Sequence, residues 1–264
     1  MVAPSANLNI MIKAARKAGR KLVRDFGEVE NLQVSIKGPG DFVTAADRKA
    51  EQVIRDELME ARPNYGWLGE ESEPVDGKDP TRRWIVDPLD GTTNFLHGLP
   101  NWCISIGLEH KGEIVAGVIL DPIKDEIFVA EKGQGAWLND RRIRVSGRRE
   151  ISEMIFATGV PWGASEELPK ALGDMAKLLP RCAGVRRFGA AALDLAYVAA
   201  GRYDGFWERG LHPWDIAAGL CILREAGALY GSLTKGTGGN VLETGDLITA
   251  NGEIYESFYK LLKD

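Results

Sequence analysis

Cysteine and histidine are scarce in this sequence. The 264 residues include three cysteines, Cys103, Cys182 and Cys221, which are far apart and odd in number. Such a set argues against a disulfide framework and favours a reducing compartment, so we expect a cytoplasmic protein. Only three histidines are present, and none pairs with a cysteine at the spacing of a zinc site. A zinc protein is therefore not expected.

Long apolar runs and an excess of positive charge are also missing. With 33 Lys and Arg against 38 Asp and Glu, the formal net charge is −5, so the molecule as a whole is not a basic nucleic-acid binder. We find no pattern of a signal peptide or a membrane span, and we expect no membrane partner. The composition, 44% apolar and 27% charged, is that of an ordinary globular protein with a substantial core.

One long amphipathic helix is predicted near the N-terminus, because apolar residues recur there at spacings of three and four. These residues are Leu8, Met11, Ala15, Ala18, Leu22 and Phe26. The opposite face carries Lys13, Arg16, Lys17, Arg20, Lys21 and Arg24. A solvated face is the expected interpretation, and contact with RNA or a membrane is the alternative.

A loop and a second helix are predicted next. Residues 36–42, IKGPGDF, contain two glycines and a proline, which predict a mobile loop. The segment 44–47, TAAD, has the spacing of a capping box, with aspartate in place of the usual glutamate. The apolar pattern then continues a helix to about Leu58.

The two halves of the chain have different patterns. Strand-like segments follow one another between Trp84 and Val145 without long helices, which predicts a largely antiparallel sheet. Beyond Gly147, strands alternate with helices, which is typical of an α/β layer. We therefore predict an N-terminal α+β domain of residues 1–146 and a C-terminal α/β domain of residues 147–264.

Two carboxylates follow a buried-strand signal in the segment 84–95, WIVDPLDGTTNF. Proline cannot donate a hydrogen bond within a sheet, so we expect the strand to end at Asp87 and Pro88. The segment 90–94, DGTTN, resembles the entry to a helix or tight turn, where free N–H groups attract phosphate. Two acidic side chains would repel that phosphate unless a cation lies between them.

The type of cation follows from the available ligands. Carboxylate and carbonyl oxygens favour magnesium or manganese, and further carboxylates occur at Glu70 and Glu71 in GWLGEES and at Asp215 in HPWDIAAG. Two metals bridged by carboxylates can hydrolyse phosphate esters. Each residue also has a local alternative: a turn for Asp87, a solvated surface for Glu70, a helix cap for Asp47, and the N-cap of a helix over residues 216–225 for Asp215.

Other phosphate-handling motifs are absent from the sequence. There is no GxxxxGK[ST] loop and no G-x-S-x-G elbow, and the spacing of three between Asp87 and Asp90 differs from the i, i+2 aspartates of haloacid-dehalogenase phosphatases. The glycine-rich segment 133–137, GQGAW, has strand-like neighbours and no following helix. It therefore predicts a hairpin and not a nucleotide loop.

Four segments together resemble the inositol monophosphatase family. They are DFVTAAD at 41–47, GEES at 69–72, WIVDPLDGTTNF at 84–95 and HPWDIAAG at 212–219. Residues 186–215 are especially similar to the bacterial branch, and the matches run in family order from about residue 10 to residue 252. The resemblance implies an αβαβα five-layer sandwich with the sugar phosphatase fold, a homodimer, and a magnesium-dependent phosphatase inhibited by lithium.

The resemblance also implies the roles of individual residues. Glu70, Asp87 and the carbonyl of Leu89 would hold one metal, and Asp87, Asp90 and Asp215 a second. Thr92 and Asp47, with Glu70, would orient and activate the attacking water. The substrate would meet Asp90, Gly91, Thr92, Gly189, Ala190, Ala191, Glu208 and Asp215. Ala190 departs from the family, because many relatives carry a hydroxyl residue there, and Ser232 stands where the family commonly has an aspartate.

The implied reaction is hydrolysis of myo-inositol monophosphate by direct attack of metal-activated water, with two or three Mg²⁺ per site and Mn²⁺ as a substitute. Residues 36–42 would close over the site and bring Lys37 or Asp41 near a third metal. The rival substrates are fructose 1,6-bisphosphate, histidinol phosphate and 3′-phosphoadenosine 5′-phosphate. A mainly non-catalytic partner of the transcription machinery, in contact with nucleic acid or RNA polymerase, is the alternative from another class. Only the basic helix face supports it locally.

Overall fold

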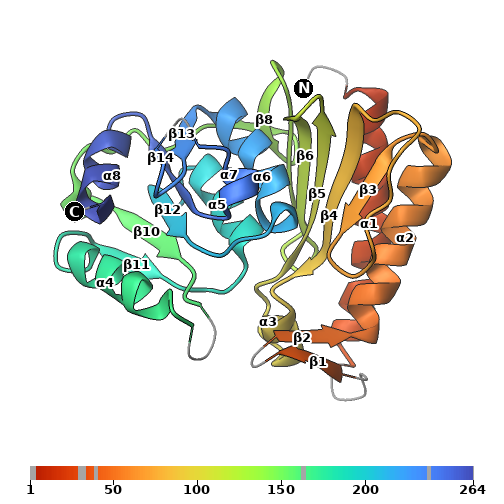
Figure 1. Ribbon diagram of the computed structural model, residues 1–264, viewed down its shortest axis with the longest axis horizontal. Helices are drawn as coiled ribbons and strands as arrows, with labels where there is room; N and C mark the ends of the chain where they lie inside the picture. Colours follow the sequence, from red (N-terminus) through yellow and green to blue (C-terminus); the bar gives the residue numbers. More distant parts are fainter. Residues whose placement is uncertain (1–3, 29–33, 39–40, 162–164, 237–238, 264) are drawn as a thin grey trace.

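Five layers of alternating helices and sheets make up the described part of the chain (Figure 1). The computed structural model describes residues 4–28, 34–38, 41–161, 165–236 and 239–263. Side chains of residues 34–38 and 41–44 lie outside this description. The order of the layers is helix, sheet, helix, sheet, helix, which confirms the expected αβαβα arrangement.

The first sheet has seven strands, in spatial order of β3 (Gly66–Gly69), β4 (Arg82–Asp90), β5 (Cys103–His110), β6 (Glu113–Asp121), β7 (Glu126–Glu131), β8 (Gly135–Leu138) and β9 (Arg141–Ile143). Every neighbouring pair is antiparallel except β3 and β4, which are parallel. The predicted antiparallel character and the hairpin at GQGAW are therefore confirmed. Helices α1 (Ala6–Phe26) and α2 (Ala45–Ala61) cover the outer face.

The second sheet has five strands, in spatial order of β11 (Gly184–Arg186), β10 (Ile155–Thr158), β12 (Gly205–Glu208), β14 (Leu247–Asn251) and β13 (Ala228–Gly231). Helices α5 (Ala191–Ala199) and α6 (Pro213–Ala226) lie between the two sheets, and α4 (Leu168–Leu178) and α8 (Tyr255–Lys263) form the last layer. The shorter elements are α3 (Thr92–Leu96), α7 (Val241–Thr244) and a 3₁₀ turn at Ile151–Glu153. Because the middle helices contact both sheets, the division at residue 146 stays a prediction.

Three apolar cores lie between the five layers. One joins α1 and α2 to the first sheet, a second joins that sheet to α5 and α6, and a third lies between the second sheet and α4 and α8. Alternate residues of β4 belong to different cores: Trp84 and Val86 face α1 and α2, whereas Ile85 faces α6. By the same alternation Asp87 points toward the middle layer.

Helix α6 approaches the first sheet very closely, because two sheet residues have no side chain. A Cβ added at Gly117 would lie 2.4 Å from the carbonyl oxygen of Ala218, and one at Gly107 would lie 2.9 Å from the Cβ of Ala217. These contacts fix the distance between the helix and strands β5 and β6. The first turn of α6, which contains Asp215, is positioned by this packing.

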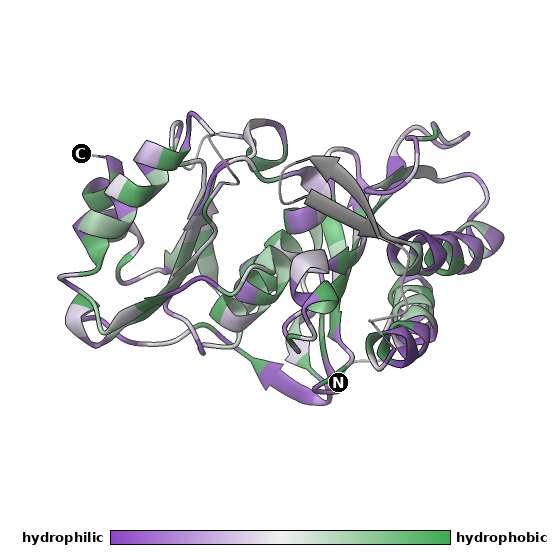
Figure 2. Cartoon of the chain, turned by 90° about the horizontal axis from the view of Figure 1, so that it is seen from below, coloured by the Kyte–Doolittle hydropathy of each residue, from purple (hydrophilic) through white to green (hydrophobic). Residues whose placement is uncertain are grey.

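The basic face of α1 is largely occupied by ion pairs. Lys13 and Lys17 both pair with Glu57 on α2, and Arg16 lies 3.2 Å from Asp125. Arg24 lies 3.7 Å from its neighbour Asp25. Figure 2 shows the hydrophilic outer surface of these two helices. The face is thus charged and mostly paired, which supports the interpretation as a solvated surface.

One loop prediction requires correction. Residues 36–42 were expected to form a mobile loop, but strands β1 (Val34–Gly38) and β2 (Asp41–Thr44) form an antiparallel pair there. Apolar and β-branched residues flank the glycines, and their strand propensity prevails. Residues 39–40 and the side chains of Lys37, Asp41 and Thr44 lie outside the described residues. Among the described helices, none is both long and apolar enough to cross a bilayer.

Candidate active site

Glu70 and Asp87 lie beside each other because β3 and β4 are parallel. Gly69, the last residue of β3, pairs with Val86, and the Glu70 N–H donates to the Val86 carbonyl over 3.2 Å. The residue after each of these is acidic: Glu70 follows Gly69, and Asp87 follows Val86. Parallel strands end at the same edge of a sheet, so the two carboxylates emerge there together.

A bulge in β4 brings Asp90 to the same edge. Asp87 pairs with Ser105 and Asp90 with Cys103, so β4 uses one residue more than β5 over this interval. The Leu89 N–H donates to Asp87 Oδ1 over 2.9 Å. The expectation that the strand ends at Pro88 is therefore wrong. The strand continues to Asp90 because a bulge has no need of the hydrogen bond that proline cannot make.

The side chain of Asp90 is held by two donors that the sequence did not reveal. The Ala192 N–H, at the start of helix α5, donates to Asp90 Oδ2 over 2.7 Å. The Cys103 thiol lies 3.7 Å from the same oxygen and donates a weak hydrogen bond. Helix N-termini stabilise anions, but no sequence motif could have paired residue 90 with residue 192.

Asp215 lies in the first turn of α6, where its backbone position differs from the expected one. The local alternative made it the N-cap of a helix over residues 216–225, but α6 begins at Pro213 and its N-cap is His212. Asp215 Oδ2 accepts the His212 N–H over 2.7 Å, as the third residue of a capping box. Proline at the first helical position moves the start three residues earlier than expected.

The buried Ser105 fastens this first turn to the sheet. Its hydroxyl donates to the Trp214 carbonyl over 3.1 Å, and its strand partner is Asp87. One serine of β5 therefore lies between the strand that carries Asp87 and the helix that carries Asp215.

The four carboxylates lie within electrostatic range of one another. Burial raises the pKa of Asp87 well above its usual value, and the negative charges of Glu70, Asp90 and Asp215 raise it further. Burial and Asp215 raise the pKa of Asp90 to about 8, against the opposing hydrogen bond from Ala192. Burial raises the pKa of Asp215 to about 7. The charged forms of Asp87, Asp90 and Asp215 are thus disfavoured where these segments meet.

Thr92 and Asp47 are joined by a hydrogen bond. The Thr92 hydroxyl lies 2.9 Å from Asp47 Oδ1 and 3.0 Å from the Leu89 carbonyl, and it can donate to either. Asp47 is fully buried on α2. Gly91 precedes Thr92 at φ 93°, in the left-handed region that favours glycine, and serves as the N-cap of α3. The predicted helix entry at residues 90–94 is confirmed.

Glu208 does not belong to the first sheet, which carries Asp87 and Asp90. It lies at the end of β12 in the second sheet. Burial raises its pKa to about 8, with contributions from Asp215 and Asp90, and a backbone hydrogen bond from Gly159 opposes the rise. Ala190 is the N-cap of α5, Ala191 is its first residue, and Gly189 precedes them at φ 74°. The Asn94 amide donates to the carbonyls of Phe188 and Gly189.

The donor set fits a hard divalent cation, because it consists of carboxylates from several segments and the backbone oxygen of Leu89. Within the described ranges, no group of three or more His, Cys, Asp or Glu side chains is placed so that it could hold a metal ion. The carboxylates nevertheless raise one another's pKa, so they lie within electrostatic range of one another.

The layered arrangement is the sugar phosphatase fold, and the family to which the chain belongs is one of phosphatases. The inositol monophosphatase family matches residues 4–264, and the chain belongs to this family. Several relatives cover almost its whole length.

Three of these relatives illustrate the range of sequence identity. Inositol-1-monophosphatase of Rhizobium meliloti (strain 1021) is 53% identical over 262 residues, covering 99% of this chain and 98% of that protein. Nus factor SuhB of Escherichia coli (strain K12) is 42% identical over 257 residues, covering 97% and 96% of the two chains. The crystal structure of extragenic suppressor protein suhB from Bartonella henselae has a TM-score of 0.95 at 52% identity, covering 98% and 99%.

Proposed function

We propose that the protein is a Mg²⁺-dependent phosphomonoesterase that hydrolyses myo-inositol monophosphate to inositol and phosphate. The observation that carries the proposal is the convergence of Glu70, Asp87, Asp90 and Asp215 from three separate parts of the chain. Relatives named Inositol-1-monophosphatase, at 49–53% identity over nearly the full length, support the substrate.

The metal ligands in this proposal are the residues that meet at the edge of the first sheet. Glu70, Asp87 and the Leu89 carbonyl would hold one cation, and Asp87, Asp90 and Asp215 would hold another. When bound, Mg²⁺ or its substitute Mn²⁺ lowers the pKa of water and compensates charge on the phosphate. A third cation near Lys37 or Asp41 stays a prediction that falls on undescribed side chains.

The chain's own contribution to the attack is the orientation of water. Because the Thr92 hydroxyl donates its only hydrogen to Asp47 or to the Leu89 carbonyl, its lone pairs are free to accept a hydrogen bond from water. The water is then aligned toward phosphorus, and Glu70 lies on the same edge to favour its deprotonation. No side chain needs to form a bond to phosphorus.

The remaining residues position the substrate. The N–H groups of Gly91 and Thr92 point fixed dipoles at the phosphate, which stabilise developing charge. Gly189, Ala190 and Ala191 at the start of α5, together with Glu208 at the end of β12, would bind the alcohol. Ala190 is fully buried and lacks a hydroxyl, so one contact available to many relatives is absent here.

Substitution of Asp90 by asparagine tests the proposal. Asp90→Asn keeps an oxygen that accepts the Ala192 N–H and removes one negative charge from the cluster. Turnover is expected to fall by orders of magnitude while the fold is retained. The exposed Asp125→Asn is the matched control. Near-normal Mg²⁺-dependent activity of the Asp90→Asn protein would contradict the proposal.

The substrate itself requires a direct comparison. We propose inositol monophosphate ahead of fructose 1,6-bisphosphate, histidinol phosphate and 3′-phosphoadenosine 5′-phosphate. The experiment is a panel of kcat/KM values for these four compounds with purified protein. A higher value for any of the other three would replace the proposed substrate.

A mainly non-catalytic role in binding the transcription machinery is the second candidate, favoured by the 42% identity to proteins named Nus factor SuhB. The catalytic and the binding role can be separated by expressing the Asp90→Asn protein in a strain that lacks the wild-type gene. Rescue of the phenotype would support binding, and failure to rescue would support catalysis.

We also propose a cytoplasmic homodimer whose activity is inhibited by lithium. Light scattering on the purified protein tests the dimer, and a lithium titration of activity at fixed Mg²⁺ tests the inhibition.

A further inference from the structure

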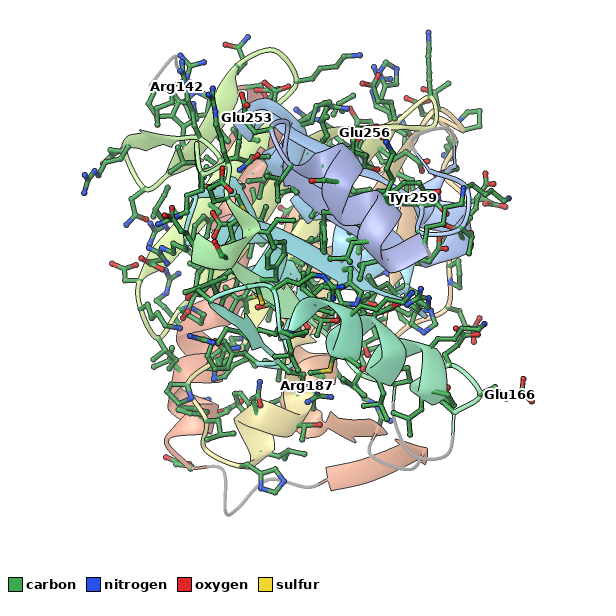
Figure 3. The ribbon with its side chains drawn as sticks, turned by 90° about the vertical axis from the view of Figure 1, so that its left-hand side faces the viewer. Arg142, Glu166, Arg187, Glu253, Glu256 and Tyr259 are labelled. Atoms are coloured by element: carbon green, nitrogen blue, oxygen red, sulfur yellow. The ribbon has the colours of Figure 1, made fainter. Side chains whose placement is uncertain are left out.

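Two adjacent arginines, Arg186 and Arg187, point in different directions at the end of β11. The guanidinium of Arg186 turns back along its own strand, where Nη1 lies 3.4 Å from the Val185 carbonyl and against Gly184. Arg187 is exposed, and its Nη2 donates to the Val160 carbonyl over 3.4 Å. Figure 3 shows Arg187 between helices α4 and α3 in that view.

Glu208 contacts the same short segment as Arg187. Its carboxylate accepts a backbone hydrogen bond from Gly159, the residue before Val160. The contact depends on glycine, since a Cβ at position 159 would lie 1.8 Å from Glu208 Oε1. Residues 159 and 160 therefore hold an acidic and a basic side chain next to each other.

The positive charge of Arg187 lowers the pKa of two nearby acidic residues, Glu208 and Asp194. Burial raises the pKa of Glu208 to about 8 and that of the buried Asp194 well above its usual value, and in both cases the Arg187 guanidinium opposes the rise. A guanidinium has five N–H donors, and the hydrogen bond from Arg187 to the Val160 carbonyl uses one of them. The side chain thus has donors to offer beside the Glu208 carboxylate.

We propose that Arg187 determines substrate specificity by binding a hydroxyl of the leaving alcohol next to the one bound by Glu208. A hydroxyl both donates and accepts, so vicinal hydroxyls can donate to Glu208 and accept from Arg187. A second phosphate would gain Arg187 but would repel the ionised forms of Glu208, Asp194 and Asp90, whose pKa values burial already raises. The site therefore takes monophosphates of polyhydroxylated alcohols, an inference that rests on the proposed function.

Arginine-to-methionine variants test this inference with paired substrates. Methionine keeps the length and apolar stem of the side chain but removes every donor. For Arg187→Met we expect kcat/KM for myo-inositol 1-phosphate to fall about 10- to 100-fold, as for loss of a hydrogen bond from a charged group. With phenyl phosphate, which has no hydroxyl, kcat/KM should stay within about twofold of wild type. The matched control, Arg186→Met, should change neither substrate, and melting curves confirm that both variants fold.

The role of Arg187 is tested by the ratio of kcat/KM for myo-inositol 1-phosphate to kcat/KM for phenyl phosphate. The proposed function is tested separately, by the activity of the wild type. Equal losses for both substrates, or no loss for either, would show that Arg187 does not bind the alcohol. A loss confined to fructose 1,6-bisphosphate would show that Arg187 binds a second phosphate instead. If the wild type hydrolyses other phosphate esters better than inositol phosphate, the same ratio, measured with any hydroxyl-bearing and hydroxyl-free pair, still decides the role of Arg187.

Discussion

At the scale of single residues, the hydroxyl of Thr92 connects three parts of the chain. It lies on α3, next to the buried Asp47 of α2 and the Leu89 carbonyl of the β4 bulge. A hydrogen held by either acceptor leaves the oxygen as an acceptor for water. The function of this side chain therefore depends on its hydroxyl more than on its size.

Thr92→Val removes the hydroxyl and keeps the shape. We expect kcat to fall by about 10²-fold or more, within the range for loss of a positioned proton-transfer group. Thr92→Ser keeps the hydroxyl and should retain most of the activity. Steady-state kinetics at saturating Mg²⁺ measure both. Equal activity of the valine and threonine proteins would remove Thr92 from the mechanism.

Gly159→Ala places a methyl group where the Glu208 carboxylate lies. The atom in conflict is the end of a flexible side chain, so Glu208 should move and the protein should still fold. We expect kcat/KM for inositol phosphate to fall more than that for phenyl phosphate, with a change in Tm of only a few degrees. A variant with unchanged substrate preference would show that Glu208 does not contact the alcohol.

Sequence motifs indicated the acidic residues that we propose as metal ligands but not the groups that hold them. Glu70, Asp87 and Asp215 each lie in a recognisable segment. Ala192 acts through its backbone N–H and Cys103 through a weak donor, so neither has a local signature. The contact between Asp90 and Ala192, which are 102 positions apart, exists only once the layers have packed.

At the scale of secondary structure, contacts between helix α6 and the first sheet fix the position of Asp215. Gly107 and Gly117 admit the helix backbone, and Ser105 bonds the Trp214 carbonyl in its first turn. Asp215 is therefore positioned by strands β5 and β6 as much as by its own helix.

Gly117→Ala should displace α6, because its Cβ would lie 2.4 Å from the Ala218 carbonyl oxygen. We expect a loss of about 1–3 kcal/mol or more in the free energy of unfolding, together with weaker Mg²⁺ binding. Gly173→Ala on α4 is the control, since nothing lies within 4 Å of its Cβ. That helical substitution should stabilise by about 0.5–1 kcal/mol. Urea unfolding and calorimetric titration measure the two effects.

The buried Asp246, next to β14, predicts a pH-dependent contribution to stability. Burial pushes its pKa up, but hydrogen bonds from Ser232 and Thr234 outweigh this and hold the pKa below its usual value. A depressed folded-state pKa gives stability that is present above the unfolded pKa of about 3.9 and is lost as pH falls through the folded value.

Ser232→Ala should therefore cost about 1.5–3 kcal/mol at pH 7, and the difference from wild type should shrink as pH falls below about 4. Urea unfolding at several pH values checks this. Ser257→Ala is the control, because that hydroxyl donates to a carbonyl, Ile254, and its small effect should not vary with pH. A constant difference for Ser232→Ala would contradict the assignment.

Element types were predictable where a pattern is long, as in α1 and the strands β5, β6 and β7. Short segments were less predictable. Proline at position 88 indicated the end of a strand, but the bulge lets β4 continue to Asp90. The glycines near residue 38 indicated a loop, yet a paired strand reaches Gly38.

At the scale of the whole molecule, the residues of the candidate site come from three different layers. Glu70, Asp87 and Asp90 come from the first sheet, Asp215 from the middle layer and Glu208 from the second sheet. Repulsion among these carboxylates opposes folding, and a bound cation offsets it. Stability and metal binding should therefore be coupled.

Asp90→Asn tests that coupling without an assay of activity. In excess EDTA the variant should have a higher Tm than wild type, by about 2–4 °C for each kcal/mol of repulsion removed. On addition of Mg²⁺ the wild type should gain stability and the variant should gain much less. Differential scanning calorimetry measures both. A lower Tm for the variant in EDTA would show that Asp90 is not repelled by its neighbours.

The most direct measurement is the anomalous scattering of Mn²⁺ in crystals grown with Mn²⁺ and phosphate. The account predicts peaks about 2–2.5 Å from carboxylate oxygens of Glu70, Asp87, Asp90 and Asp215, with phosphate beside them and near Thr92. Peaks found only elsewhere, or the four carboxylates turned away from one another, would contradict it.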